Sequence, residues 1–182
     1  MKVLIVSDSH GINGPLRTAL TKERPDMLIH LGDCEHSQSE IASWAGAPKT
    51  ACIFIKGNCD ITSCDPSIVR NVAVFSLNGH KIYCTHGHIQ HVNYGLLTLS
   101  LSAQEQDCDI CMFGHTHVPY DSFGEAVTKY NRYYDSGYGN PSGPRIINPG
   151  SLSLPRGGSK RGYMILDMED DGRYDLSYLT LE

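Results

Sequence analysis

Short apolar runs are separated by polar segments along the first third of the chain. The runs Val3–Val6, Met27–Leu31 and Ala51–Ile55 have the length and apolar content of buried strands. Between them, residues 14–23 place apolar side chains on one face at helical spacing, and residues 37–44 predict a short helix with a Ser37 cap and Glu40 at the capping-box position. Strands that alternate with helices in this way predict a parallel sheet covered by helices.

The pattern changes after residue 69, where hairpins become the dominant prediction. Residues 70–77 and 80–85 flank Asn78-Gly79, a dipeptide that strongly favours a two-residue hairpin turn. Residues 162–168 and 174–181 alternate around a polar tetrapeptide and predict a second hairpin that closes the chain.

The remaining segments predict a Leu-rich helix at 93–104 and a buried strand at 110–113, and residues 145–147 lead into Asn148-Pro149-Gly150-Ser151. Residues 120–143 are rich in Tyr, Gly and Asp, and we expect most of them to form an exposed loop or an irregular hairpin. Together the two halves predict an α/β (α+β) sandwich of mixed sheets with helices outside. A chain of 182 residues is most simply one domain spanning 1–182.

Polar residues of the types that bind metals follow five of the predicted strands. Because sites in alternating β/α folds form at the carboxyl ends of strands, these side chains can converge. Each residue alone could be a cap, a turn residue or a surface group, but their repetition at strand ends favours a metal site. The candidate ligands are Asp8, His10, Asp33, Asn58, His86, His115 and His117.

Carboxylate oxygens and imidazole nitrogens together suit divalent transition metals. Seven such ligands exceed the needs of one metal and suit two metals that share a bridging carboxylate. Two metals about 3.5–4 Å apart can hold a phosphoryl group and activate water for in-line attack. The net charge of −5 argues against general nucleic-acid binding, which needs a basic surface, but allows a small anionic substrate held by metals.

Composition places the chain among soluble globular proteins, with 40% hydrophobic and 19% charged residues. No apolar run reaches transmembrane length, and the first one is too short for a signal peptide, so we expect no membrane partner. The seven cysteines are odd in number and lack the spacing of a disulfide framework, which indicates free thiols. We therefore expect a cytoplasmic protein.

The order of the polar motifs resembles that of a known family, the calcineurin-like metallophosphoesterases. The resemblance is strongest to the small bacterial and archaeal phosphodiesterases of the YfcE type, and it extends to about residue 168. It implies a four-layer sandwich of two mixed β-sheets flanked by helices, the metallophosphoesterase fold. The motifs that carry it are Asp8-Ser9-His10, Gly32-Asp33, Gly57-Asn58-Cys59-Asp60, His86-Gly87-His88, Gly114-His115-Thr116-His117 and Asn148-Pro149-Gly150-Ser151.

The resemblance also implies a role for each candidate ligand. Asp8, His10 and His117 would hold the first metal, and Asn58, His86 and His115 the second. Asp33 would bridge the two, and a hydroxide shared by the metals would be the nucleophile. We expect two divalent ions, manganese first, with iron, zinc and nickel as alternatives that the mixed ligand set also allows.

The sequence departs from many relatives at Cys59, where they carry a histidine that can act as general acid. A thiol donates a proton to an alkoxide less readily than an imidazolium does. We therefore expect esters with good leaving groups, such as aryl phosphodiesters, to be hydrolysed better than alkyl esters. Cys59 could instead be a small packing residue. His88 could supply the missing acid, or it could face solvent or substrate without a proton role.

Other polar residues near the motifs each allow two interpretations. Asp60 could orient Asn58 or a histidine, or could simply form the turn. Asn148 and Ser151 could orient ligands or build the turn around Pro149. The basic side chains of Arg156, Lys160 and Arg161 could attract a phosphate-bearing substrate or form a solvated loop.

The sequence thus predicts an enzyme, a metal-dependent phosphodiesterase in which Asp33, Asn58 and His88 act on a small phosphoester substrate. A phosphomonoesterase is one alternative. The other is a non-catalytic, Vps29-like protein-binding scaffold, which would be free to lose ligands that this chain retains. The hairpins could support a homo-oligomer, although no residue pattern requires one.

Overall fold

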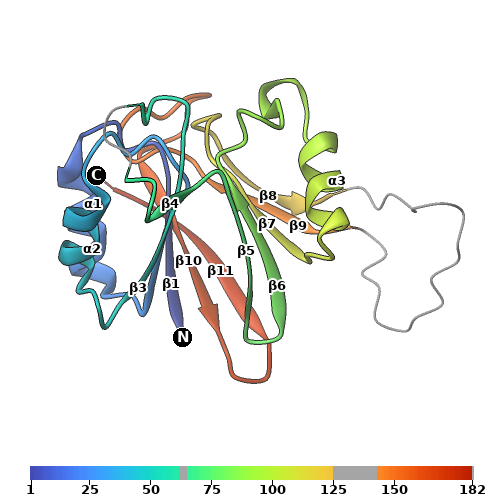
Figure 1. Ribbon diagram of the computed structural model, residues 1–182, viewed down its shortest axis with the longest axis horizontal. Coiled ribbons are helices and arrows are strands. Elements are labelled where there is room, and N and C mark those ends of the chain that lie inside the picture. The colour runs from blue at the N-terminus through green and yellow to red at the C-terminus, as the bar shows by residue number, and fades with distance from the viewer. Residues whose placement is uncertain (62–64, 125–142, 182) are drawn as a thin grey trace, which may run out of the picture.

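Two β-sheets face each other, and helices cover the outer face of each sheet (Figure 1). The computed structural model describes residues 1–61, 65–124 and 143–181. The strand order is β11-β10-β1-β2-β3-β4 in the first sheet and β5-β6-β7-β9-β8 in the second. Both sheets are mixed. Together with the helices on their outer faces they form the expected four-layer sandwich.

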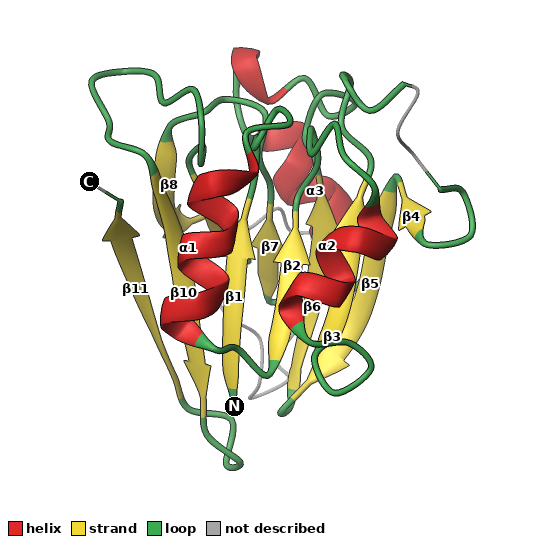
Figure 2. Ribbon diagram, turned by 90° about the vertical axis from the view of Figure 1, so that its left-hand side faces the viewer, coloured by secondary structure: helices red, strands yellow, loops and turns green. Residues whose placement is uncertain are grey.

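The first sheet contains the alternating strands and helices of the early chain. Strands β1 to β4 run parallel, and β10 joins the edge of β1 in the antiparallel sense. The elements are β1 (Lys2–Val6), α1 (Asn13–Glu23), β2 (Met27–His30), α2 (Gln38–Ala45), β3 (Ala51–Ile55), β4 (Val69–Arg70), β10 (Gly162–Met168) and β11 (Tyr174–Thr180). Figure 2 shows α1 and α2 lying over one face of this sheet.

The second sheet combines hairpins with parallel pairs. Strands β6, β7 and β9 run parallel, whereas β5 and β8 are antiparallel edge strands. The elements are β5 (Val72–Leu77), β6 (His80–Thr85), a 3₁₀ turn (Val92–Tyr94), α3 (Leu97–Glu105), β7 (Ile110–Met112), β8 (Pro119–Phe123) and β9 (Arg145–Pro149).

Three apolar clusters hold the four layers together. Ile5 and Ile29 of the first sheet pack against Ile82 and Met112 of the second, and all four are fully buried. Separate clusters join α1 and α2 to the first sheet and α3 to the second. Burying one such side chain contributes about 1.5–3 kcal/mol, so the cluster between the sheets fixes their relative position.

Two of the predicted elements begin or belong elsewhere. The helix expected from residue 93 begins at Leu97, because Gly95 adopts a φ of 141° and ends the preceding 3₁₀ turn. The sequence pattern predicts Arg70 in the first strand of the first hairpin, but Arg70 pairs with Ile55 in the first sheet. The chain crosses from one sheet to the other between Arg70 and Val72.

The segment 120–143, expected to be mostly an exposed loop or an irregular hairpin, begins with a regular strand. Residues up to Phe123 form strand β8, which pairs with β9 along its whole length. Every side chain after Pro119 in β8 is exposed, so the strand lacks the apolar alternation by which strands are recognised in a sequence. The rest of that segment, residues 125–142, lies outside the described residues.

Within the described ranges, no helix has the length and apolar character that would be needed to cross a membrane.

His80 joins the two hairpin turns at the end of the sandwich. Its Nδ1 contacts a carboxylate oxygen of Asp109, and its Nε2 lies 2.7 Å from the carbonyl oxygen of Gly172. Both partners are acceptors, so only the protonated imidazolium can donate to both. Burial opposes the charge, but the hydrogen bonds to Asp109 and Gly172 outweigh it and raise the pKa of His80 above its ordinary value.

We predict that this contact stabilises the fold more in acid than in base. The stabilisation is complete below the unfolded-state pKa, about 6.5, and is lost as the pH rises through the raised folded-state pKa. Urea unfolding of the wild type and of His80→Gln should therefore give a larger stability difference at pH 5.5 than at pH 8.5. Asp109→Asn should show the same trend, and an equal difference at both pH values would contradict the assignment.

Candidate metal centre

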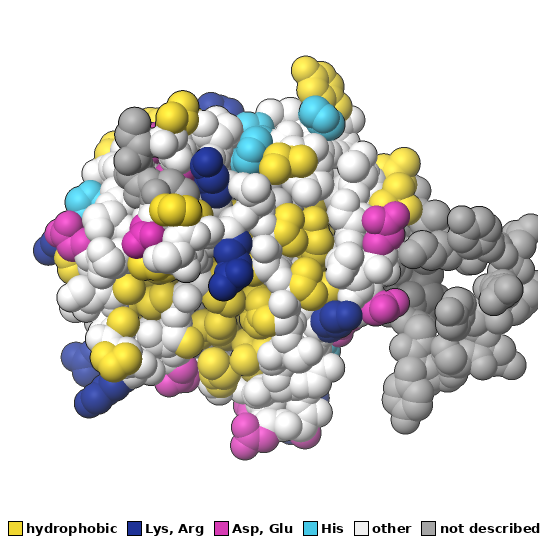
Figure 3. Space-filling model, viewed as in Figure 1, with side chains coloured by type: hydrophobic (Ala, Val, Ile, Leu, Met, Phe, Trp, Pro, Cys, Tyr) yellow, Lys and Arg dark blue, Asp and Glu magenta, His cyan; other side chains and the backbone are white. Residues whose placement is uncertain are grey.

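The loops that follow five strands meet at one edge of the sandwich. Strands β1, β2 and β3 run parallel in one sheet, and β6 and β7 run parallel in the other, so within each sheet these carboxyl ends lie together. Figure 2 shows the loops after β1 and β2 gathered at the upper edge, and Figure 3 shows histidines at the surface near that edge. The predicted ligands are carried by these loops.

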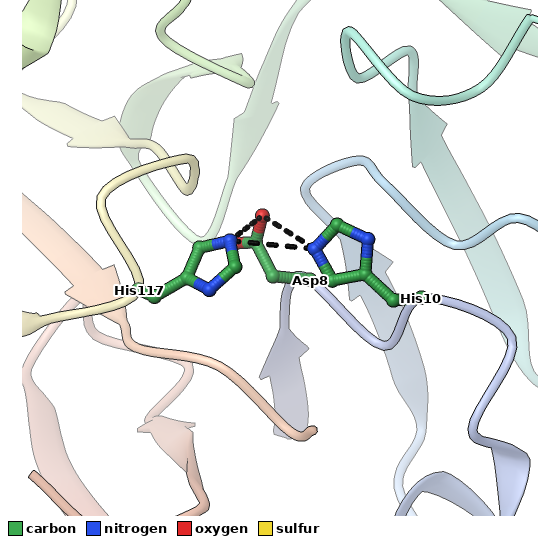
Figure 4. Close-up of side chains that lie close together, drawn as sticks. All are labelled: Asp8, His10 and His117. Atoms are coloured by element: carbon green, nitrogen blue, oxygen red, sulfur yellow. Dashed lines mark hydrogen bonds and ion pairs between the residues drawn. The ribbon is translucent and has the colours of Figure 1, made fainter. Parts of the chain in front are cut away.

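Asp8, His10 and His117 form the first group of potential ligand atoms (Figure 4). The Nε2 atom of His117 lies 3.2 Å from Asp8 Oδ1 and 3.3 Å from Nε2 of His10. His10 Nε2 lies 4.0 Å from the same Asp8 oxygen. Asp8 and His117 are buried, and the His10 side chain is 15% exposed. The group is thus open to solvent on the His10 side.

Asp8, Asp33 and His86 form a second group beside the first. His86 Nε2 lies 3.4 Å from Asp33 Oδ2, and it lies 3.2 Å from Oδ1 of Asn58. The same Asp33 oxygen lies 4.0 Å from Nε2 of His10. Asp33 therefore faces a histidine of each group, which is the position a bridging carboxylate would occupy.

His115 and His88 flank the second group. The ring of His115 lies 5.1 Å from that of His86, and its Nε2 is 3.0 Å from the side-chain amide nitrogen of Asn93. The ring of His88 lies 5.3 Å from that of His86. The structure therefore brings all of the predicted site residues to one edge, although the ligand atoms of His115 and His88 are not among the two close groups.

Most of these residues share an unusual backbone conformation. Asp8, His10, Asp33, His115 and His117 all have φ between 45° and 68°. Left-handed backbone is uncommon outside glycine and costs of order 1–3 kcal/mol per residue. Each left-handed residue turns the chain sharply as it leaves its strand. The turns explain how residues only two apart, such as Asp8 and His10, direct their side chains to one point.

A buried carboxylate fixes two of the loops to each other. Asp60 is fully buried, and Oδ2 accepts the backbone N–H of Asp33 at 2.8 Å and that of Gly57 at 2.9 Å. Its Oδ1 accepts the N–H of Glu35 at 2.8 Å. Asp60 therefore holds the backbone of the loops and not the side chain of Asn58 or of a histidine, among the described contacts.

Asn148 and Ser151 support the site through main-chain contacts. The amide nitrogen of Asn148 donates to the carbonyl oxygen of Gly114 at 2.9 Å, and its Oδ1 accepts from Gly150. The hydroxyl of Ser151 donates to the carbonyl oxygen of Asp8 at 2.7 Å. Both residues thus build their own turn and also position a ligand loop. Of the nearby cations, Arg161 donates to the carbonyl oxygen of Ser153.

The electrostatics of the groups favour the charged carboxylates and the protonated rings of His86 and His117. Burial would raise the pKa of Asp8 and Asp33, but hydrogen bonds and positive charge from His117 and His86 hold both pKa values below their ordinary range. Burial would likewise lower the pKa of His86 and His117, but the two carboxylates raise it. Buried carboxylates are stable here only beside positive charge.

The donor set fits a divalent cation. The Nδ1 atoms of His10 and His117 face acceptors, namely Glu35 Oε1 at 2.6 Å and the carbonyl oxygen of Leu154 at 2.7 Å. If those nitrogens carry the protons, the two Nε2 lone pairs point toward the same place. In that tautomer neither ring donates to Asp8 Oδ1, which is buried there without another hydrogen-bond donor among the described residues. Three convergent lone-pair atoms need a positive charge between them, and a transition metal suits them.

Cys59 and His88 have environments that bear on proton transfer. Burial and the charge of Asp33 raise the pKa of the Cys59 thiol to about 11, so the thiol stays protonated at neutral pH. Burial and the proximity of His86 lower the pKa of His88. His88 Nδ1 is itself buried without a hydrogen-bond partner. The Cys59 sulfur accepts the side-chain amide N–H of Asn58 at 3.1 Å, whereas no described contact uses Nδ1 of His88.

Sequence reasoning missed two residues that contact the candidate ligands. Glu35 accepts from His10, and Asn93 pairs with His115. Glu35 follows Asp33 so closely that it looks like part of the same turn. Asn93 was assigned only to a helix start. Neither residue type signals its partner, because the contacts depend on how distant segments fold together.

A family model for the calcineurin-like phosphoesterase superfamily domain matches residues 1–171. The chain therefore belongs to this superfamily, and the two mixed sheets and three α-helices of its described residues are the metallophosphoesterase fold. The buried groups of Asp and His side chains lie in this matched region.

Two named relatives cover most of the chain. The probable metallophosphoesterase YsnB of Bacillus subtilis is 32% identical over 173 residues, which are 94% of this chain and 86% of YsnB. The phosphodiesterase YfcE of Escherichia coli is 25% identical over 187 residues, which cover 92% of this chain and 88% of YfcE.

Solved structures share the fold. A predicted phosphoesterase from Streptococcus pneumoniae superposes with a TM-score of 0.73 at 26% identity, covering 98% of this chain and 88% of that one. Vacuolar protein sorting 29 from Cryptosporidium parvum gives a TM-score of 0.65 at 17% identity, covering 99% and 98%. The second likeness concerns the fold alone.

We predict that Asp60→Asn destabilises the protein and weakens its affinity for divalent metal. An amide in place of the carboxylate offers one acceptor oxygen to three N–H donors, and it turns its own N–H₂ toward at least one of them. Leaving buried donors unpaired costs about 1–3 kcal/mol. Urea unfolding and metal titration measure the two effects.

The matched control is Asp26→Asn, since the exposed Asp26 accepts one backbone N–H, from Lys2 at 2.7 Å. It should leave metal affinity unchanged. Equal metal affinity in both variants would show that Asp60 does not position the ligand loops.

Proposed function

We propose that the protein is a phosphodiesterase that uses two divalent metal ions to hydrolyse a small phosphoester. The observation that carries the proposal is the convergence of Asp8, Asp33, His10, His86 and His117. Their ligand atoms lie side by side in two groups, and Asp33 faces both. Membership of the calcineurin-like superfamily supports the same chemistry.

In this proposal one ion lies at each group, and Asp8, which belongs to both groups, is assigned to the first ion. Asp8, His10 and His117 hold the first, and Asp33 is shared with the second. Asn58, His86 and His115 complete the second position. The side-chain amide of Asn93 lies 3.0 Å from Nε2 of His115. With that amide turned so that its oxygen accepts the Nε2 proton, Nδ1 keeps its lone pair for a cation. Manganese is the first candidate, and iron, zinc and nickel fit the same mixture of nitrogen and oxygen.

Two cations held side by side by these residues would polarise the phosphoryl group of the substrate and would lower the pKa of an attacking water. The chain's own contribution is to hold that geometry. Asp33 keeps the two positions together, because its Oδ1 accepts the N–H of Cys59 at 2.7 Å while Oδ2 faces the histidines. Asn58 and His88 lie on the second side, where they can contact the substrate.

The environment of Cys59 supports a preference for good leaving groups. The thiol is exposed and stays protonated at neutral pH, and a donor of such high pKa gives little assistance to a departing alkoxide. We therefore propose aryl phosphodiesters as better substrates than alkyl ones. A phosphomonoesterase is separated from this proposal by the ratio of diester to monoester turnover.

The scaffold alternative draws on the fold that the chain shares with vacuolar protein sorting 29. A protein that acts only as a scaffold does not need to keep the metal ligands. Here every expected position carries a suitable side chain, which favours the enzyme. Hydrolysis of an aryl phosphodiester with added manganese, iron, zinc or nickel tests the point, and no activity with any of them would favour the scaffold.

We predict that Asp33→Ala abolishes hydrolysis and reduces metal binding at both positions, because it removes the shared ligand. Metal content after dialysis and activity on an aryl diester measure the two losses. Asp175→Ala, which removes an exposed carboxylate on β11, is the control and should change neither. If one position kept its full occupancy in Asp33→Ala, Asp33 would not bridge.

We predict that Cys59→His raises the rate on diesters with poor leaving groups, by up to about 10²–10⁴-fold if the missing general acid is limiting. Diesters with good leaving groups should gain much less, because their departure needs little protonation. A series of aryl and alkyl diesters measures the dependence of rate on leaving-group pKa. The same dependence in the variant as in the wild type would exclude a missing acid.

A further inference from the structure

The two ring nitrogens of His10 serve different partners. Its Nε2 points inward, 3.3 Å from Nε2 of His117 and 4.0 Å from oxygens of Asp8 and Asp33. Its Nδ1 points outward and lies 2.6 Å from Oε1 of Glu35. A neutral imidazole has one N–H and one lone pair, so the outward contact decides which nitrogen is left with the lone pair.

His86 and His117 also point Nε2 inward and are held at Nδ1, but their Nδ1 partners are of another kind. Nδ1 of His86 lies 2.7 Å from the carbonyl oxygen of Leu31, and Nδ1 of His117 lies 2.7 Å from that of Leu154. Both anchors are main-chain atoms that no substitution removes. His10 is the one of these three whose anchor is a side chain, Glu35.

We propose that Glu35 is a positioning residue that fixes the tautomer of His10 and so sets the metal affinity of the first position. The inference rests on the proposed metal-dependent function. By accepting the Nδ1 proton, Glu35 leaves the Nε2 lone pair directed at Asp8 and His117. Its negative charge behind the ring also makes that nitrogen a stronger ligand.

The backbone of Glu35 is held in place by hydrogen bonds of its own segment and of the neighbouring loop. Its backbone is left-handed, with φ of 48°, and its N–H donates to the buried Asp60. The loop of His10 is bound to the same segment, because the N–H of His10 donates to the carbonyl oxygen of Asp33 at 2.9 Å. Asp60 thereby fixes the backbone of both Asp33 and Glu35. As a result, the Asp33 carboxylate faces the ligand groups and the Glu35 carboxylate lies behind the ring of His10.

A second pair in the chain provides a matched control. Nε2 of His36 lies 3.0 Å from Oε2 of Glu40, and the Glu40 side chain is 51% exposed, against 41% for Glu35. Glu40 is therefore a glutamate of similar exposure that also pairs with a histidine. The difference is that His36 is not among the residues of the two ligand groups.

The experiment compares Glu35→Ala, Glu35→Gln and Glu40→Ala with the wild type. Manganese and zinc titrations against a competing chelator measure the affinity of each position. Two-bond ¹⁵N–¹H correlation spectra of the metal-free proteins at pH 8 report which nitrogen of His10 carries the proton. Thermal unfolding checks that the variants keep their fold.

We expect Glu35→Ala to lower the affinity of one of the two positions about 10–100-fold, the usual effect of losing a partner of a metal-bound histidine. The other position should keep its affinity, and excess metal should restore hydrolysis. Glu35→Gln should lose less, since its amide oxygen can still accept the proton but carries no charge. Glu40→Ala should match the wild type.

In the spectra, the proton of His10 should lie on Nδ1 in the wild type and be shared between both nitrogens in Glu35→Ala. Unchanged tautomer populations in Glu35→Ala, or a metal affinity equal to that of Glu40→Ala, would overturn the proposal. Glu35, His10 and Cys59 also lie close enough together to hold an ion themselves. Three ions in the wild type and two in Glu35→Ala would make Glu35 a ligand and would also overturn it.

The spectra separate this inference from the proposed function. If the wild type took up no divalent metal, the proposed function would fail. The tautomer of His10 would still show whether Glu35 orients the ring.

Discussion

Two buried carboxylates set the main constraint on this molecule. Asp8 is fully buried and Asp33 nearly so, and a charge in the interior is costly unless opposite charge or hydrogen-bond donors surround it. The chain meets that need with histidines from three loops and with backbone N–H groups, such as that of His115, which donates to Asp8 at 3.1 Å. The two sheets therefore have to bring their carboxyl ends together at one edge.

The loops can meet at that edge only if parts of their backbone adopt a strained conformation. Five of the candidate ligands are left-handed, and strain of that kind persists only where the surroundings fix it. Asp60, Asn148 and Ser151 supply the fixing contacts through hydrogen bonds to main-chain atoms. The apolar cluster between the sheets then locks the loops of one sheet against those of the other. The site is thus a property of the whole sandwich.

Much of this arrangement could be predicted from the sequence, because its signals are local. Apolar runs such as Val3–Val6 mark the buried strands, and the residues that follow them mark the site edge. Strand β8 could not be predicted, since its side chains are exposed and its pairing with β9 joins segments far apart in the chain. Glu35 was missed for the same reason, because its partner His10 lies 25 residues away.

The inward-facing histidines are oriented by two kinds of hydrogen-bond acceptor, a main-chain carbonyl oxygen and a side-chain carboxylate. His86 depends on the carbonyl oxygen of Leu31, at the end of a buried strand, so its orientation is as stable as the sheet. His10 depends on the side chain of Glu35, which is partly exposed and can move without unfolding anything. Solvent and salt weaken an exposed ionic contact far more than a buried hydrogen bond. The contact behind His10 therefore depends on its surroundings, whereas the contact behind His86 does not, and Asp33 faces both rings.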